Sequence, residues 1–291
     1  MVKVKVPATS ANVGVGFDCL GIALNLYTYF TFERSDSFQI TGCEERFATE
    51  DNLVYTSFQK ALAYLGKDAF QLHIHIDSHV PVSRGLGSSA TCVVGGVVGA
   101  YALTNTPIDK QEVLRLCTEI EHHPDNVAPA IYGGLIASYV DDNQQVYHAS
   151  YSVHNQFTFL ACIPNFETKT SDARKVLPTQ VPFTTAVSNA SKLSLVLKGF
   201  ELGDVALLQA TMEDELHEPY RKQLIFEYEQ VKKLCQEIES ACFYISGSGS
   251  TLMNVMCDAS KVDEIQKQLN TLQYKWQCIP LVVDEQGVQI C

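Results

Sequence analysis

A glycine-rich loop between a strand-like segment and a helix of small, apolar residues is the feature that most constrains this chain. The loop spans residues 81–90. Gly85 and Gly87 allow a positive φ and a close approach of the backbone to a ligand. Ser88 and Ser89 stand where a helix N-cap is expected, beside backbone N–H groups that have no partner inside the helix. These groups lie at the positive end of the helix dipole, so the loop suits a bound phosphate.

Three kinds of nucleotide-binding loop and a plain glycine turn remain open for this stretch. A Walker loop ends in Gly-Lys-Ser/Thr, and here Gly87 is followed by two serines without a lysine. A dinucleotide fingerprint is met formally by Gly85, Gly87 and Ala90. However, Pro81 precedes the first glycine, and no acidic residue closes a strand about 20 positions later. A non-Walker phosphate loop fits better, with one serine hydroxyl for a phosphate oxygen and the other for Mg²⁺. A dinucleotide-binding oxidoreductase is the alternative from a different class.

Composition and charge argue against several classes of protein. The 291 residues are 46% apolar and 19% charged, which supports a sizeable core in one large or two ordinary domains. No apolar run is long enough for a membrane span, and the first residues alternate rather than form a signal peptide. The net charge of −12 disfavours a nucleic-acid surface, because phosphates need clustered lysine and arginine. We therefore expect neither a nucleic acid nor a membrane as a partner.

The cysteines indicate a reducing compartment. The chain has 10 of them without a CxxC pair, and several lie in apolar runs, where cysteine packs as a small hydrophobic residue. No ligand spacing suits zinc. Together with the lack of a secretory signal, this usage predicts a cytoplasmic protein.

The order of the expected elements indicates an α+β fold in two parts. The first part, residues 1–155, is expected to contain strands over residues 2–6, 26–32, 71–78, 135–140 and 145–151 and helices over residues 51–65, 88–103 and 109–121. The second part, residues 156–291, is expected to contain strands over residues 157–162, 242–246, 251–257 and 276–283 and helices over residues 185–202, 204–215, 223–240 and 258–272. This order is typical of an α+β layer.

Three further segments are dense in polar residues. Residues 7–21 follow the first strand and, taken alone, are interpreted as a polar loop. Residues 121–130 gather carboxylates, imidazoles and an amide at a helix end, where a metal site and a solvated helix end are both open. Pro124 keeps His123 out of helical geometry there. Residues 246–251 form either a hairpin turn or a second phosphate-facing glycine turn.

Taken together, these segments resemble the GHMP kinase superfamily over essentially the whole chain. The resemblance rests on PATSANVGVGFD at residues 7–18, PVSRGLGSSA at residues 81–90 and SGSGST at residues 246–251. They occur in the order of the three motifs of the superfamily. Within it, HPDNVAPA at residues 123–130 and TSDAR at residues 170–174 are most similar to the members that phosphorylate L-homoserine.

The resemblance implies a fold and a reaction. The fold would be the two-domain GHMP kinase fold, with an ATP-binding α/β unit like domain 2 of ribosomal protein S5 and a C-terminal ferredoxin-like α+β sandwich. The reaction would use ATP and Mg²⁺ to phosphorylate the side-chain hydroxyl of L-homoserine, giving O-phospho-L-homoserine in threonine biosynthesis. A mevalonate-type kinase of the same superfamily is the nearest alternative. A homodimer is expected from the resemblance.

The resemblance also implies which residues form the site. The ATP-binding residues would be Asn52, Pro81, Val82, Ser83, Arg84, Gly85, Leu86, Gly87, Ser88, Ser89 and Ala90. The third glycine motif adds Gly247, Ser248 and Gly249, and the metal ligands would be Ser89 and Glu121. The substrate-binding residues would be Asn12, Asp18, His123, Arg174 and Arg221. Catalytic roles would fall on Asn12, Asp18, Thr170 and Arg174, without a dedicated strong base, because the first motif has no lysine after Lys5.

Overall fold

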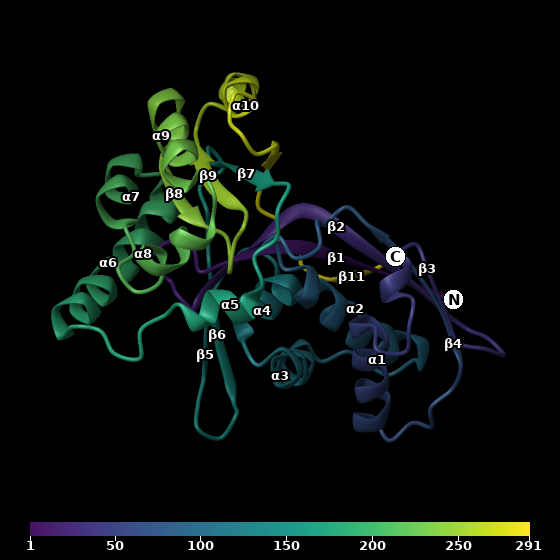
Figure 1. Ribbon diagram of the computed structural model, residues 1–291. Coiled ribbons are helices and arrows are strands. Elements are labelled where there is room, and N and C mark those ends of the chain that lie inside the picture. The colour runs from purple at the N-terminus through teal and green to yellow at the C-terminus, as the bar shows by residue number, and fades with distance from the viewer.

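Two β-sheets form the framework of the protein, which is described by a computed structural model of residues 1–291 (Figure 1). The larger sheet contains β1 (Val2–Ala11), β2 (Leu20–Arg34), β3 (Gln39–Thr41), β4 (Leu72–Ser78), β5 (Leu135–Val140), β6 (Val146–Tyr151) and β11 (Gln289–Ile290). Its strand order is β11-β1-β2-β4-β3, with β5 paired to β2 and β6 to β5. The smaller sheet contains β7 (Thr158–Pro164), β8 (Cys242–Ile245), β9 (Leu252–Met256) and β10 (Trp276–Leu281). Its order is β10-β7-β9-β8, and all of its neighbouring strands are antiparallel.

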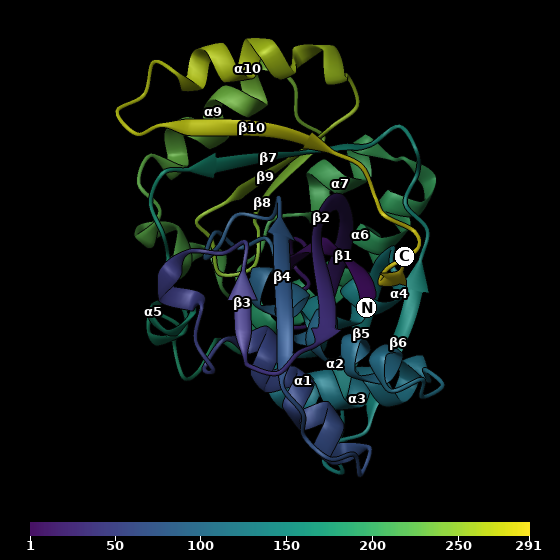
Figure 2. The same cartoon turned by 90° about the vertical axis from the view of Figure 1, so that its right-hand side faces the viewer.

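The helices fall into two groups, each beside one sheet (Figures 1 and 2). The larger sheet is accompanied by α1 (Leu53–Tyr64), α2 (Ser88–Leu103), α3 (Lys110–Glu121) and α4 (Pro124–Tyr132). The smaller sheet is accompanied by α6 (Phe183–Leu202), α7 (Val205–Thr211), α8 (Glu218–Arg221), α9 (Tyr228–Ile238) and α10 (Val262–Leu269). A short helix, α5 (Thr170–Lys175), lies in the chain between β7 and α6. None of the helices combines the length and the apolar content that crossing a membrane requires.

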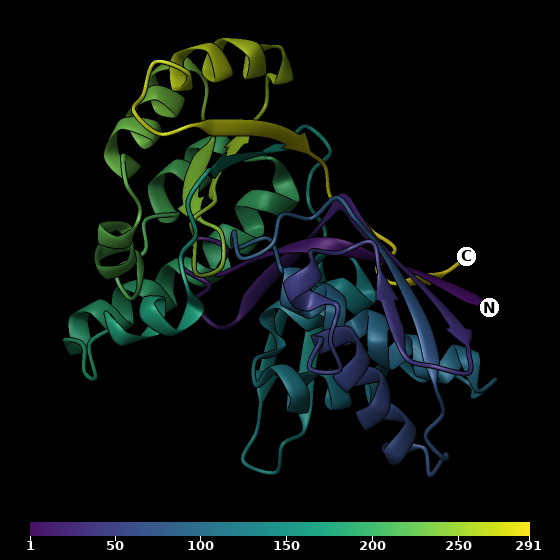
Figure 3. The same cartoon turned by 45° about the vertical axis from the view of Figure 1, so that its right-hand side comes forward.

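The two sheets share an apolar core at their junction. Leu20 and Ile22 of β2 are fully buried in the same cluster as Phe159 of β7 and Tyr244 of β8. Strand β11 pairs with the start of β1, which brings the two chain termini together (Figure 3). The predicted α+β class is confirmed. The division into residues 1–155 and 156–291 stays a proposal.

Helix α2 has the bounds that the sequence predicted. It has glycines where it packs on the larger sheet and on α1. A Cβ atom at Gly95 would overlap the ring of Phe30 in β2. A Cβ atom at Gly96 would overlap the backbone carbonyl oxygen of Val54 in α1. Only residues without side chains permit these approaches. The close packing fixes the position of α2, and the first turn of this helix is the last part of the glycine loop.

The expectation of a loop directly after Val6 is wrong, because β1 continues to Ala11. After a register shift between Pro7 and Ala8, the strand pairs with β2 again. Its polar side chains are satisfied inside the protein: the Thr9 hydroxyl donates to Asn126 Oδ1 (2.8 Å), and the Ser10 hydroxyl bonds to that of Tyr244 (3.1 Å). The hydroxyl residues of this segment therefore led to the prediction of a polar loop, whereas Thr9 and Ser10 lie in a buried strand.

Two helical expectations also need correction. Residues 124–132 form α4, for which the sequence analysis assigned no helix; Pro124 occupies its first turn, where a missing N–H costs nothing. His123 before it is extended (φ −140°, ψ 130°), as its position ahead of a proline predicted. The helix expected over residues 223–240 begins only at Tyr228, because a 3₁₀ turn over Lys222–Leu224 precedes it.

Gly96→Ala is expected to lower the free energy of unfolding by about 1–3 kcal/mol, because the new methyl group would press on the Val54 backbone. The matched control is Gly199→Ala in α6, where the methyl group would first meet the movable end of Leu208. Helix propensity favours alanine at both positions. Urea unfolding followed by circular dichroism measures the two variants, and equal stabilities would contradict a tight contact between α1 and α2.

Candidate active site

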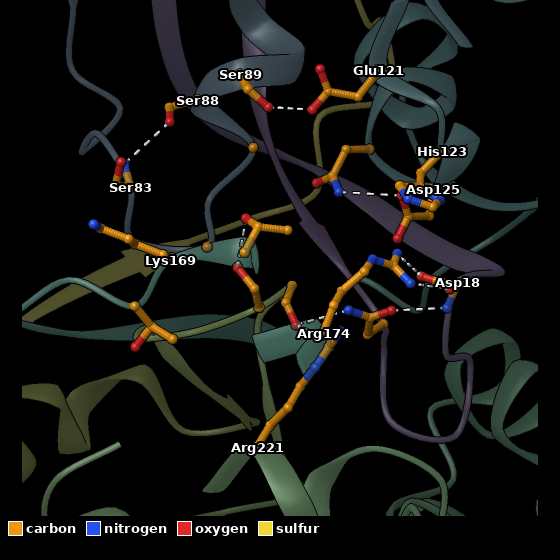
Figure 4. A pocket seen from close by; sticks show the side chains of 18 residues that line it. Asp18, Ser83, Ser88, Ser89, Glu121, His123, Asp125, Lys169, Arg174 and Arg221 are labelled. Atoms are coloured by element: carbon orange, nitrogen blue, oxygen red, sulfur yellow. Dashed lines mark hydrogen bonds and ion pairs between the residues drawn. The ribbon is translucent and has the colours of Figure 1, made fainter. Parts of the chain in front are cut away.

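A polar cleft lies where the glycine loop meets the smaller sheet (Figure 4). It has a volume of about 190 Å³ and is lined by 18 residues, none of them hydrophobic. The lining residues are Asn12, Asp18, Ser83, Gly85, Gly87, Ser88, Ser89, Glu121, His123, Asp125, Asn126, Thr168, Lys169, Thr170, Arg174, Arg221, Gly247 and Ser248. All three glycine motifs of the sequence therefore contribute to one cleft.

The glycine loop has the conformation that a phosphate loop requires. Gly85 and Gly87 have φ values of 79° and 68°, in the left-handed region. The first main-chain bond of α2 runs from the Thr91 N–H to the Gly87 carbonyl (2.9 Å). The preceding N–H groups of the helix, at Ser88 and Ser89, have no helical partner and lie beside the cleft. They can donate to an anion.

The third glycine motif is a hairpin turn between β8 and β9 that also lines the cleft, and its role toward a phosphate stays a prediction. The Ser246 hydroxyl donates to the Gly85 carbonyl (2.6 Å), which joins the turn to the glycine loop. The Gly247 N–H donates to the Ala11 carbonyl (2.9 Å). In the other direction, the Gly247 carbonyl accepts from Asn12 Nδ2 (2.8 Å). The turn thus links the end of β1 to the phosphate loop.

Asp18 and Arg174 form a two-bond ion pair at the other end of the cleft. The guanidinium donates to both carboxylate oxygens, at 2.8 and 3.0 Å. This pairing raises the pKa of Arg174. Asn12 Oδ1 accepts from the Asp18 N–H (2.9 Å), and Asn12 and Asp18 both have positive φ values, 58° and 52°. Non-glycine residues in this region are uncommon and cluster at functional sites.

Arg221 is almost completely buried, with 2% of its surface exposed. Its Nε donates to the Ala173 carbonyl (3.2 Å) and its Nη1 to the Gly247 carbonyl (3.1 Å). No carboxylate lies within ion-pair distance of it. Burial lowers the pKa of Arg221 to about 10. The residue is a fixed cation held by backbone carbonyls.

The segment around Pro124 supplies a second acidic group. Asp125 is 4% exposed, and burial, followed by the charge of Asp18, raises its pKa to about 7. Burial, followed by the charge of Arg174, lowers the pKa of His123, so its imidazole is neutral at neutral pH. Neutral imidazole both donates and accepts hydrogen bonds.

Ser89 and Glu121 lie together, as the sequence predicted for a metal site. The Ser89 hydroxyl donates to a Glu121 carboxylate oxygen. Burial raises the pKa of Glu121, and the bond from Ser89 opposes that shift. No group of three or more His, Cys, Asp or Glu side chains is placed to hold a metal ion alone. A hydroxyl and a carboxylate suit a hard cation that takes its other ligands from phosphate and water.

Several predicted ATP-binding residues do not line the cleft, namely Asn52, Pro81, Val82, Arg84, Leu86 and Ala90, and neither does Gly249 of the third glycine motif. Asn52 caps α1 by accepting from the Val54 N–H (3.0 Å). Leu86 and Ala90 are fully buried beneath the loop. Arg84 turns toward the Pro164 carbonyl and the Glu167 carboxylate. A role for these side chains with ATP stays a prediction.

Four lining residues were not assigned a role from the sequence: Asp125, Asn126, Thr168 and Lys169. Asp125 and Asn126 belong to the polar segment that the sequence analysis singled out. Thr168 and Lys169 precede α5 in an irregular stretch after β7, where the sequence carries no periodic signal.

Comparisons with known proteins agree with this geometry. The model of the GHMP kinases N terminal domain matches residues 52–134. A homoserine kinase of Clostridium botulinum (strain Okra / Type B1) is 40% identical over 293 residues, covering 100% of this chain and 98% of that protein. The chain belongs to the homoserine kinase family.

Solved structures of homoserine kinases extend the comparison to the fold. The crystal structure of homoserine kinase from Cytophaga hutchinsonii is 28% identical with a TM-score of 0.89, covering 100% of this chain and 97% of that one. A putative homoserine kinase from Listeria monocytogenes is 27% identical with a TM-score of 0.83, covering 100% and 99%. The predicted GHMP kinase fold and kinase class are confirmed, and a dinucleotide-binding oxidoreductase is ruled out.

Asp125→Asn in this kinase is expected to reduce the pH dependence of stability. The folded protein holds the Asp125 proton more tightly than the unfolded chain does, so ionisation costs stability as the pH rises from 3.8 toward about 7. Asparagine removes this cost. The free energy of unfolding of the variant, minus that of the wild type, should therefore increase from pH 5 to pH 7 and level off above.

Asp172→Asn is the matched control for this experiment. Asp172 is exposed and bonded to Lys175, which lowers its pKa, so it stays ionised over the same range and the corresponding difference should be flat. Urea unfolding at several pH values measures both. A flat difference for Asp125→Asn would contradict the raised pKa.

Proposed function

We propose that this kinase transfers the γ-phosphoryl group of ATP to the side-chain hydroxyl of L-homoserine, giving O-phospho-L-homoserine. The observation that carries the proposal is the Arg221 guanidinium, which lines the cleft while 2% exposed and has no carboxylate partner. A buried cation that no carboxylate contacts is costly. An anionic group of the substrate, the α-carboxylate, is its natural complement.

Charges of both signs at this end of the cleft favour a zwitterion. Arg174 and Arg221 suit a carboxylate, because a guanidinium presents two parallel N–H donors. Asp18 and Asp125 suit an ammonium group, and both lie in the cleft near these arginines. His123 is neutral at neutral pH and adds a hydrogen bond without changing the charge balance.

The triphosphate is assigned to the opposite end, on the N–H groups of the glycine loop. When bound, Mg²⁺ would be held by Ser89 and Glu121 and would neutralise phosphate charge. The hydroxyls of Thr170 and Ser248 lie 3.3 Å apart, and both residues line the cleft. We assign this pair to the γ-phosphoryl group, where their O–H groups can donate to its oxygens.

The transfer forms one bond and breaks another. The homoserine hydroxyl oxygen bonds to the γ-phosphorus as the bond from that phosphorus to the bridging oxygen of ADP breaks. Both Asp18 oxygens already accept bonds from Arg174, so we assign Asp18 to orienting the substrate. The hydroxyl proton leaves late, to a phosphoryl oxygen. Positioning and charge stabilisation then account for the rate without a dedicated base.

A panel of matched alcohols tests the substrate. Homoserine with ATP and Mg²⁺ is expected to give O-phosphohomoserine, detected by mass spectrometry, with ADP release giving the rate. 4-Hydroxybutanoate lacks only the ammonium group, and 3-aminopropan-1-ol lacks only the carboxylate. Each should show a kcat/KM at least about tenfold lower, because a charge-assisted bond contributes about 1.5–3 kcal/mol. Mevalonate is the control for the nearest alternative, and a kcat/KM equal to that of homoserine would overturn the proposal.

Glu121→Gln is expected to lower kcat and to raise the Mg²⁺ concentration needed for half-maximal rate by about tenfold, because a neutral amide binds a hard cation less well than a carboxylate. The control is Glu119→Gln on the same helix, whose side chain is exposed and paired with Arg115. Rates measured across a Mg²⁺ titration at fixed ATP compare the two. An unchanged metal response in Glu121→Gln would remove this residue from the metal site.

The homodimer and the cytoplasmic location expected from the sequence stay predictions.

A further inference from the structure

One cationic side chain of the cleft is without a partner. Of the three lysine and arginine residues that line it, Arg174 is paired with Asp18 and Arg221 is bonded to backbone carbonyls. Lys169 is the third; its side chain is exposed and makes no hydrogen bond or ion pair. In Figure 4 its amine lies on the side of the cleft where Ser83 and Ser88 of the glycine loop are found.

The adjacent residue has an unsatisfied polar group. Thr168 is 7% exposed, and its hydroxyl has no hydrogen-bond partner although it lines the same cleft. Leaving a buried hydroxyl unpaired costs about 1–3 kcal/mol. A ligand oxygen beside Thr168 would remove that cost. The orphan hydroxyl and the unpaired ammonium of Lys169 therefore indicate the same kind of ligand.

The segment that carries these two residues is fastened to the glycine loop. Arg84 of the loop donates from Nε to the Pro164 carbonyl (3.2 Å) and pairs through Nη1 with Glu167 (3.1 Å). The Ser250 hydroxyl donates to the Phe166 carbonyl (2.7 Å). These contacts hold the chain before α5 against the phosphate loop. The backbone position of Lys169 is thus set by contacts with the glycine loop and with the third glycine motif.

We propose that Lys169, assisted by the Thr168 hydroxyl, binds the β- and γ-phosphates of ATP. The inference rests on the proposed function and names a further residue for it. The glycine loop has no lysine of its own, its Arg84 is paired with Glu167, and its N–H groups supply partial charges only. The cleft also contains Asp18, Glu121 and Asp125, which repel a polyphosphate. The ammonium of Lys169, on the side of the cleft where Ser83 and Ser88 lie (Figure 4), supplies a full positive charge that no carboxylate neutralises.

Nucleotide binding in the absence of homoserine tests this role. Titration calorimetry would measure the affinities of ATP, ADP and AMP, with EDTA present so that only protein groups contact the phosphates. Lys169→Met is expected to weaken ATP binding about ten- to a hundredfold, because it removes a charged donor. ADP should be weakened less, and AMP, which has neither phosphate, should bind as it does to the wild type. Thr168→Val, close in shape, should weaken ATP binding by a smaller factor.

Two further variants control for charge and for folding. Lys175→Met removes a lysine at the end of α5, the short helix that Lys169 precedes; Lys175 is paired with Asp172 and does not line the cleft, so the affinities of this variant should be those of the wild type. Lys169→Arg keeps the charge and should restore most of the ATP affinity. Equal loss for ATP and AMP in Lys169→Met, or no loss for either, would overturn the proposal. If the wild type binds ATP but forms no phosphohomoserine, the proposed function fails, while these affinities still decide the role of Lys169.

Discussion

The backbone of Gly247 makes the contacts on which the geometry of the cleft depends. Its carbonyl accepts from Asn12 Nδ2 at 2.8 Å and from Arg221 Nη1 at 3.1 Å, and its N–H donates to the Ala11 carbonyl at 2.9 Å. These partners belong to the end of β1 and to α8, which lie far apart in sequence. The backbone of one residue therefore fixes the positions of both Asn12, after β1, and the buried guanidinium of Arg221. Since carbonyl groups hold Arg221, its charge remains available to a ligand.

The charge of the chain explains why these local arrangements matter. The net charge is −12, and ATP and the α-carboxylate of homoserine are both anionic. Binding must therefore come from groups whose positive character is concentrated in the cleft. In the proposed assignment, free N–H groups at the start of α2 act at one end of the cleft, and arginines act at the other. Asp125 costs less there than a full charge would, because burial raises its pKa to about 7.

Local patterns were sufficient for the glycine loop and α2. The small residues of α2 gave its bounds, Ser88–Leu103, because no competing pattern interrupts them. The same reasoning failed at Thr9 and Ser10, whose hydroxyls are typical of loops. Their partners, Asn126 and Tyr244, are more than a hundred residues away, so no local window contains the reason that they are buried. The assignment of His123 and Arg221 to one site came from the family resemblance and not from the periodicity of the sequence.

Lys169 shows where such reasoning ends. The chain has 21 lysine and arginine residues, most of which lie at its surface. Lys169 follows an irregular stretch that contains no motif. Its place depends on Arg84, for which the resemblance implies a contact with ATP and which pairs with Glu167 at 3.1 Å. Arg84 of the glycine loop thus binds the segment that carries Lys169. The two sides of the cleft are joined before any ligand arrives, which reduces the ordering that ATP binding must impose.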